Sequence, residues 1–393
     1  MIRPGGTILT RAEIIACARR VVVKVGSGVL TRQVGLDHHR VEVLAGQICR
    51  LAEGNRQVVL VSSGAIASGV AQAGLPGPPR SIPEKQAAAA LGQAGLMQAY
   101  EEAFAHHGRK VAQVLLTAGD LRSRKRYLNA RNTLFTLLEW GVVPVINEND
   151  TVVVEEIKLG DNDNLAAMLT NLLGAGLLIN LTNVDGVMDA DPRKNPEARL
   201  IPQVSQVSTK LLQVASSLPG AVGRGGILSK VRAAERVARA GAHTIVANGL
   251  DDHIIDRLRE GEELGTLFLP HARLNRRKHW IAFAVRQDGE VVVDDGAVAP
   301  LSKGGKSLLA VGIREVRGRF GAGAAVRVLD GRGAVLAVGL SNYSSQELER
   351  IQGRHSHEIE EILGRKDFEE VIHRDNLVVF SSEDKETMSC LLN

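Results

Sequence analysis

The feature that most constrains this chain is a regular alternation of short β-branched runs and longer helix-like stretches across its first 270 residues. The runs lie at residues 21–25, 58–61, 111–115, 142–146, 177–181 and 244–246, and the longest helix-like stretches at 83–107, 125–140 and 164–173. Strands that alternate with helices form a mainly parallel sheet with helices on both faces. We therefore predict an α/β fold, a three-layer αβα doubly wound sheet, in which ligands bind beyond the carboxyl ends of the strands.

The pattern changes at about residue 277. Short strand-like pieces follow at residues 280–284, 290–293, 325–329 and 335–340, with glycine-rich turns and no long helix between them. This indicates a small β-rich module. We expect an N-terminal extension at 1–19, an α/β domain at 20–270, the β-rich domain at 277–372 and a C-terminal tail at 373–393.

Composition excludes several classes of protein. The 393 residues are 44% hydrophobic and 23% charged, which suits packed cores rather than disorder. The apolar runs are too short to span a membrane, so no membrane partner is expected. The 3 cysteines lie far apart without a CxxC pair, which argues against a disulfide framework and favours the cytoplasm. A net charge of +4 gives no global reason for nucleic-acid binding.

Three loops are suited to phosphate, and the first two of them follow predicted strands. Lys24-Val-Gly-Ser-Gly28 combines a cation with glycines that allow close backbone approach. Ser62-Ser-Gly-Ala65 and Gly223-Arg-Gly-Gly-Ile-Leu-Ser-Lys230 each lead into a helix, whose free N–H groups bind anions. Helix capping and a flexible loop explain the same residues without a ligand.

Two dense polar runs lie beside apolar elements. They are Asn147-Glu-Asn-Asp150, after a strand, and Gly160-Asp-Asn-Asp-Asn164, at the start of a helix. Their carboxylates and amides could hold an ammonium group and Mg²⁺. Capping and turn formation are the alternative interpretation of each run alone.

Together these loops resemble those of the glutamate 5-kinase branch of the amino acid kinase family. The pairing of the 147–150 run with the 160–164 run is the most specific element, and further matches lie at 22–26, 63–67, 128–131 and 189–192. The C-terminal stretch is similar to a PUA domain, with matching elements at 275–278, 293–297 and 355–359.

The resemblance implies roles for individual residues. Lys24, Asp161 and Lys230 would be catalytic, with Lys24 and Lys230 on the phosphates and Asp161 holding both lysines in place. Glutamate would be bound by Ser63, Asn147, Asp150, Asn162 and Asp163. The nucleotide would contact Lys24, Gly26, Thr182, Asn183, Arg224, Gly225, Gly226, Ile227, Leu228, Ser229 and Lys230. The metal ligands are not identified, although Asp163 is one candidate.

The resemblance also implies the reaction and its partners. The expected activity is transfer of a phosphoryl group from ATP, with Mg²⁺, to the γ-carboxylate of L-glutamate, the first step of proline synthesis. Proline is expected as a feedback inhibitor, and the chain as a dimer or tetramer that associates with glutamyl phosphate reductase. RNA binding is not expected. The alternatives are another kinase of this fold and a non-catalytic RNA-binding or regulatory protein.

Three departures from the family pattern concern the nucleotide loops. Asn183 stands where many members have Asp, and Met188-Asp189 replaces the usual Tyr-Thr. Arg224 and Ile227 occupy positions where Thr and Met are usual. We expect these changes to affect nucleotide affinity, base preference or turnover, and to leave the glutamate loops untouched.

Overall fold

The computed structural model describes residues 9–32, 35–152, 162–217, 226–270, 287–304 and 306–380. The chain divides into two compact units, residues 1–273 and 274–393.

The core of the first unit is an eight-stranded sheet with the strand order β3-β4-β2-β1-β5-β7-β8-β6. Its strands are β1 (Arg20–Val25), β2 (Gln57–Ser62), β3 (Val111–Leu116), β4 (Val143–Glu148), β5 (Leu177–Thr182), β6 (Gln203–Val204), β7 (His243–Asn248) and β8 (Thr266–Phe268). Among the described strand pairs of this sheet, only β7 with β8 is antiparallel. The predicted mainly parallel α/β sheet is confirmed.

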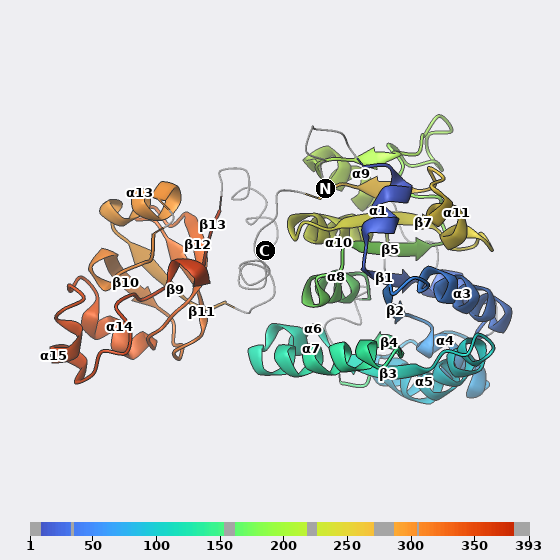
Figure 1. The fold of residues 1–393 in the computed structure, drawn as a ribbon, viewed down its shortest axis with the longest axis horizontal. Coiled ribbons are helices and arrows are strands. Elements are labelled where there is room, and N and C mark those ends of the chain that lie inside the picture. The colour runs from blue at the N-terminus through green and yellow to red at the C-terminus, as the bar shows by residue number, and fades with distance from the viewer. Residues whose placement is uncertain are drawn as a thin grey trace. The chain divides into compact units, whose positions relative to one another are not determined.

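Helices cover both faces of this sheet. They are α1 (Arg11–Cys17), α2 (Ser27–Leu30), α3 (His38–Leu51), α4 (Ala65–Gln72), α5 (Ile82–Ala105), α6 (Ala118–Arg122), α7 (Arg124–Glu139), α8 (Asn162–Leu173), α9 (Thr209–Ser217), α10 (Ile227–Arg239) and α11 (Ile254–Glu260). Figure 1 shows α7, α8 and α10 on one side of the strands, and α3, α5 and α11 on the other. Each side has its own hydrophobic core, so the unit has the predicted three layers.

The alternation of β1 explains how a lysine reaches the interior. Successive strand residues point to opposite faces, and Val21, Val23 and Val25 pack in the core beneath α3 and α5. Val22 packs in the opposite core, beneath α8. Lys24 therefore lies on the face of Val22, one residue from the carboxyl end of the strand.

The N-terminal extension is docked on the first unit by a buried arginine. Thr10 and Glu13 form a capping box that starts α1. Arg11, which is 6% exposed, donates to the carbonyl oxygens of Pro202, Leu264 and Gly265. These carbonyls precede β6 and β8, so Arg11 fixes α1 against the end of the sheet.

The second unit is built on a five-stranded sheet with the order β10-β9-β11-β12-β13. Its elements are β9 (Gln287–Val293), α13 (Asp295–Gly304), η2 (Ala310–Gly312), β10 (Ile313–Arg317), β11 (Ala325–Leu329), β12 (Val335–Leu340), α14 (Ser345–Ile351), α15 (Ile359–Leu363), η3 (Arg374–Asn376) and β13 (Leu377–Val379). This β-rich module matches the predicted class.

Two expectations for this unit are corrected. The predicted tail from residue 373 contains η3 and β13, and β13 pairs with β12 because Leu377 and Val378 are apolar and only 2% exposed. The stretch predicted to lack a long helix contains α13, which includes Pro300 and begins where the Asp294 side chain accepts a hydrogen bond from the Ala297 N–H. The piece predicted as a strand at 280–284 lies outside the described residues.

Within the described residues, no helix has both the length and the apolar character that crossing a membrane requires.

Candidate active site

An ion-pair bridge joins two lysines to one carboxylate at the carboxyl end of the sheet. The Lys24 Nζ lies 2.6 Å from Asp163 Oδ1, and the Lys230 Nζ lies 3.2 Å from Asp163 Oδ2. None of the three side chains is more than 5% exposed. Two cations on one anion give this buried group of charges a net positive charge, which suits a bound anion.

The three residues come from elements that meet at the centre of the sheet. Lys24 is the penultimate residue of β1, Asp163 the second residue of α8 and Lys230 the fourth residue of α10. The first turns of α8 and α10 therefore meet at the end of β1. The partial positive charge of both helix N-termini adds to that of the lysines.

Burial and neighbouring charges shift the pKa values in this bridge. Burial lowers the pKa of Lys24 to about 8, with Lys230 also lowering it and Asp163 opposing the shift. Burial raises the pKa of Asp163, but Lys24 and Lys230 outweigh burial and bring it well below its usual value. At neutral pH, Lys24 is thus mostly protonated and Asp163 is ionised.

Two uncharged side chains also contact the Asp163 carboxylate. Asn180 Nδ2 donates to Oδ1 at 3.0 Å. Ser229 Oγ lies 2.6 Å from Oδ2 and 2.8 Å from the carbonyl oxygen of Gly226. Each carboxylate oxygen therefore contacts one lysine and one neutral polar group.

A cluster of amides lies next to Asp163. Asn162 Nδ2 is 2.9 Å from both Ser63 Oγ and Asn147 Oδ1. Asn147 Nδ2 donates to Gln93 Oε1 at 2.9 Å, and the Glu148 N–H donates to Asn147 Oδ1 at 2.9 Å. These polar side chains come from β4, α5, α8 and the residue that follows β2, and they form a connected group that can orient a polar ligand.

Glycines bring the elements of this amide cluster together. Gly64 follows Ser63 and has φ +115°, a left-handed conformation that favours glycine, as it begins α4. A Cβ on Gly92 would lie 2.0 Å from the Ala65 carbonyl oxygen, and one on Gly69 would lie 1.8 Å from the Ala88 carbonyl oxygen. The backbones of α4 and α5 can approach this closely only without side chains, and this contact positions Gln93.

The loops that follow β1 and β5 lie side by side. The Gly26 N–H donates to the Leu181 carbonyl oxygen at 3.1 Å, and a Cβ on Gly26 would lie 3.6 Å from the Lys24 Nζ. A Cβ on Gly28 would lie 3.3 Å from the Asn183 side chain. Gly26 and Gly28 thus bring the loop after β1 close to Leu181 and Asn183, beside the Lys24 ammonium group.

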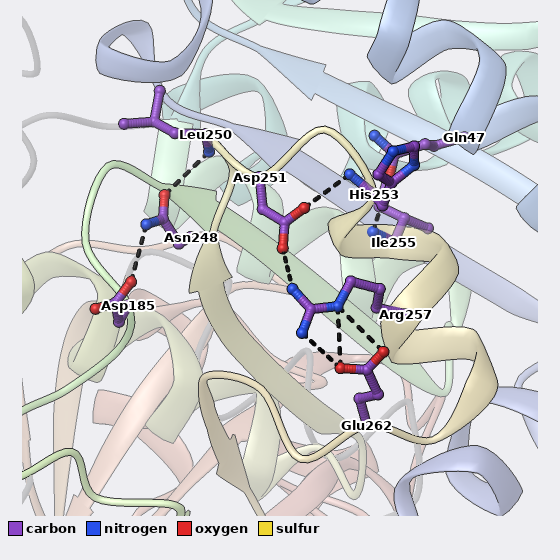
Figure 2. A network of polar contacts seen from close by, with 9 residues as sticks. All are labelled: Gln47, Asp185, Asn248, Leu250, Asp251, His253, Ile255, Arg257 and Glu262. Atoms are coloured by element: carbon purple, nitrogen blue, oxygen red, sulfur yellow. Dashed lines mark hydrogen bonds and ion pairs between the residues drawn. The ribbon is translucent and has the colours of Figure 1, made fainter.

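A polar network ties the loop after β5 to the loop after β7 (Figure 2). Asn248, opposite Thr182 in the sheet, donates to Asp185 Oδ1 at 2.9 Å and accepts from the Leu250 N–H at 3.0 Å. The network also contains Asp251, His253, Arg257, Glu262, Ile255 and Gln47. The bond between Asn248 and Asp185 ties the loop that carries Asn183 to the end of β7.

Most of the described residues in the predicted site meet at this edge. Lys24, Lys230, Asp163, Asn162, Asn147 and Ser63 form the bridge and the amide cluster. Gly26, Thr182 and Asn183 lie in or next to the loops after β1 and β5, and Gly226, Ile227, Leu228 and Ser229 at the start of α10. Asp150 is half-buried in the turn after β4. Asp161, Arg224 and Gly225 lie outside the described residues.

The role of the bridging carboxylate is corrected. The resemblance assigned it to Asp161, whereas the carboxylate between the two lysines is that of Asp163. Asp163 lies in the first turn of α8, so its position is fixed by the helix that packs beneath the sheet. The sequence predicted both lysines, but it gave the bridging role to the first aspartate of the Asp-Asn-Asp run, whereas the structure shows the second in that position.

Two participants were not predicted. Gln93 follows Gly92 in a long helix, and the sequence analysis gave it no role in binding a ligand. Asn180 had a signal, because an amide interrupts the apolar run Leu177-Leu-Ile-Asn-Leu181. Within the described residues, no group of three or more His, Cys, Asp or Glu side chains could hold a metal ion.

The comparisons with known proteins agree with this geometry. Residues 19–248 match the model of the amino acid kinase family. The chain is 52% identical to a glutamate 5-kinase of Citrifermentans bemidjiense over 371 residues, which cover 94% of this chain and 100% of that protein. The chain belongs to the amino acid kinase family. The ion-pair bridge and the amide cluster both lie within the residues that match the amino acid kinase family.

Further relatives and a second domain match as well. The chain is 53% identical to a glutamate 5-kinase of Pelobacter propionicus (94% of this chain, 100% of that protein) and 49% identical to one of Cupriavidus taiwanensis (93% and 99%). Residues 289–363 match the PUA domain model, so this amino acid kinase carries a C-terminal PUA domain. A solved UMP kinase of Bacillus anthracis aligns at a TM-score of 0.43 and 16% identity, over 65% of this chain and 98% of that chain.

Proposed function

We propose that this protein transfers the γ-phosphoryl group of ATP to the γ-carboxylate of L-glutamate, forming L-glutamyl 5-phosphate in the first step of proline biosynthesis. The observation that carries the proposal is the pair of lysines held 2.6 and 3.2 Å from one buried carboxylate, beside a cluster of amides. The curated relatives named glutamate 5-kinase support the choice of substrate.

The nucleophile is supplied by the substrate. A glutamate side chain has a reference pKa of about 4.3, so its γ-carboxylate is already ionised at neutral pH. No general base is therefore needed. One γ-carboxylate oxygen bonds to the γ-phosphorus, the bond from that phosphorus to the bridging oxygen breaks, and its electron pair leaves with ADP.

The main obstacle is the repulsion between a carboxylate and a triphosphate. Catalysis of phosphoryl transfer is largely positioning and electrostatic stabilisation. In the proposed reaction, Lys24 and Lys230 donate to the phosphate oxygens and offset this repulsion. Asp163 keeps both ammonium groups aimed at one point, because each of its oxygens contacts one of them.

The amide cluster is the proposed site for the amino acid. Ser63, Asn147 and Asn162 offer one hydroxyl and two amides within hydrogen-bond reach of one another. They can bind the charged ends of a small amino acid without adding charge to the site. Asp150 is the proposed partner of the substrate ammonium group.

The nucleotide is proposed to lie over Gly26, with Thr182 and Asn183 on one side and the start of α10 on the other. Mg²⁺ is usually held by substrate phosphates and a few carboxylates, and it would neutralise phosphate charge. Both oxygens of Asp163 are engaged by lysines. We therefore infer that the residues described fit a Mg²⁺ ion carried by the ATP phosphates rather than one held by Asp163.

The deciding experiment measures ATP turnover with L-glutamate, trapping the acyl phosphate with hydroxylamine. N-acetylglutamate, aspartate, carbamate and UMP are tested in parallel as substrates of other kinases of this fold. Formation of the hydroxamate with glutamate alone supports the proposal. Turnover with another acceptor, or none with any, would reject it.

Regulation, assembly and location are further proposals. Proline, which resembles cyclised glutamate, is proposed to inhibit by binding at the amide cluster. A dimer or tetramer and association with glutamyl phosphate reductase rest on the family resemblance, and a cytoplasmic location on the three separated cysteines. Inhibition assays with proline, light scattering and co-purification with the reductase test them separately.

The PUA domain is proposed to have a structural or regulatory role rather than to bind RNA. Two of its arginines are paired with carboxylates: Arg317 and Arg327 both contact Glu290, and Arg317 also lies 2.8 Å from Glu315. Phosphate binding would have to break these pairs. A salt-dependent gel shift of the full chain with mixed RNA tests this proposal.

A further inference from the structure

Asn180 is a polar residue in a strand whose interior is otherwise apolar. It lies in β5, where its side chain and the side chains of the neighbouring leucines and isoleucine are completely buried. An amide placed in such an interior is unfavourable unless it gains a specific hydrogen bond. Asn180 therefore requires an explanation beyond packing.

The sheet places Asn180 directly beside Lys24. The two are partners in the register of β1 and β5, so their side chains leave the same face of the sheet. Both then reach the same atom: Asn180 Nδ2 is 3.0 Å, and Lys24 Nζ 2.6 Å, from Asp163 Oδ1. One carboxylate oxygen thus accepts from a charged donor and from a neutral one.

The other half of the Asn180 amide has no such partner. Within the described residues, Asn180 Oδ1 is buried without a hydrogen bond. An unpaired buried acceptor costs stability. The unpaired oxygen of Asn180 therefore lowers the stability of the folded chain. The hydrogen bond from its Nδ2 to Asp163 is the interaction that explains an asparagine at this position.

We propose that Asn180 is a positioning residue for phosphoryl transfer, which fixes the orientation of the Asp163 carboxylate so that Lys24 and Lys230 converge. This proposal rests on the proposed function. A carboxylate can rotate about its χ2 bond, which has a broad torsional preference. The donor at 3.0 Å comes from a rigid strand and restricts this rotation, which a flexible lysine cannot do.

The test compares Asn180→Leu with the parent, using the full chain. Loss of one hydrogen bond to a charged group should lower kcat about tenfold. The KM for glutamate should change less than twofold, because the amide cluster is untouched. The Tm should stay the same or rise, because an unpaired buried oxygen is removed.

Thr244→Val is the matched control. Thr244 lies in the adjacent strand β7, is 1% exposed and also has a buried oxygen without a partner among the described residues. It should keep the kcat of the parent. An equal fall of kcat in both variants would overturn the proposal, because it would reflect a general effect of altering the strand.

A double-mutant cycle tests whether Asn180 acts through Asp163. In an Asp163→Asn background, Asn180→Leu should have less than a twofold further effect on kcat. A full tenfold effect in that background would overturn the proposal. If Asn180→Leu does not fold, Asn180→Ser, which is too short to reach the carboxylate, takes its place in the cycle.

A crystal structure of Asn180→Leu separates this inference from the proposed function. If the parent does not phosphorylate glutamate, the proposed function fails, and a rotated Asp163 carboxylate still supports the positioning role. An Asp163 carboxylate in its original orientation, with both lysines in place, would overturn the inference whatever the parent's activity.

Discussion

At the scale of single residues, the site buries two positive charges and one negative charge. Lys24 and Lys230 share one carboxylate, so removing either lysine leaves a neutral pair and removing Asp163 leaves two cations that repel each other. Burial of its excess positive charge is unfavourable, and the group is buried almost completely. It is stabilised when a polyanion binds, because the ligand supplies the missing negative charge.

Lys230→Ala should lower kcat far more than it raises the KM for glutamate. Lys230 stabilises charge on the transferring phosphoryl group in the proposed reaction, and loss of one such donor costs about 100- to 1,000-fold in kcat. Steady-state kinetics measures both constants. Lys210→Ala, on the exposed side of α9, is the control and should match the parent. Equal kcat values in the Lys230 variant and the parent would remove this lysine from the chemistry.

The pH dependence of kcat/KM for ATP should show a limb near pH 8. The pKa of Lys24 is lowered to about 8, so its ammonium group loses its proton as the pH rises through this value and can no longer offset phosphate charge. Because kcat/KM reports the free enzyme, the limb of kcat should lie at higher pH, where bound phosphate has raised the pKa of Lys24.

Lys24→Arg is the control for this assignment. A guanidinium stays charged throughout this range, so the limb should disappear even if the rate is lower. A parent profile of kcat/KM that stays flat to about pH 10, the usual range of a lysine pKa, would contradict the role of Lys24.

The sequence predicted which residue types belong to the site better than it predicted their pairing. Lys24 and the 147–150 run were predicted at the ends of strands, and Lys230 and the 160–164 run at the starts of helices. The choice between Asp161 and Asp163 depended on the rotation of α8, which a run of alternating polar residues does not reveal. The contact of Asn180 with Asp163 joins residues 17 positions apart and could not be predicted from local spacing.

At the scale of elements, the contact between α4 and α5 controls the amide cluster. Gly92→Ala should destabilise the protein by about 3 kcal/mol, since a Cβ there would lie 2.0 Å from one backbone atom of α4 and 2.2 Å from another. It should also raise the KM for glutamate, because Gln93 and Ser63 must move apart. Urea unfolding and steady-state kinetics measure the two effects.

Gly77→Ala is the matched control. Gly77 lies between the same two helices, but a Cβ on it would contact nothing within 4 Å. The free energy of unfolding of the Gly77→Ala variant should remain within about 0.5 kcal/mol of that of the parent. If Gly92→Ala were as stable as Gly77→Ala, the close approach of α4 and α5 would not be needed for the fold.

Elements with a continuous run of apolar residues could be predicted from the sequence, and short or irregular elements could not. The β-branched runs became β1 to β5 and β7, because a buried parallel strand needs a continuous apolar run. β13 was missed because its three residues follow a polar turn and become a strand only by pairing with β12. α13 was missed because Pro300 is a local signal against a helix.

At the scale of the whole molecule, the two units have separate hydrophobic cores. The first unit has one core on each face of its sheet, and the second has a core formed by β9 to β13 and the helices that pack on them. Each unit therefore has the means to fold cooperatively. The residues proposed to bind ATP and glutamate lie in the first unit, within residues 19–248 matched by the amino acid kinase family.

Calorimetry of the full chain should accordingly show two unfolding transitions. A ligand that binds one folded unit stabilises that unit by an amount that grows with its free concentration. A non-hydrolysable ATP analogue, Mg²⁺ and glutamate together should raise the Tm of the larger transition and leave the smaller one unchanged, because this mixture binds without reacting. Glycine in place of glutamate serves as the control and should produce only the part of the shift that is due to the nucleotide. A single transition that moves as a whole with ligand would mean that the PUA domain unfolds together with the kinase domain, and that substrate binding stabilises both.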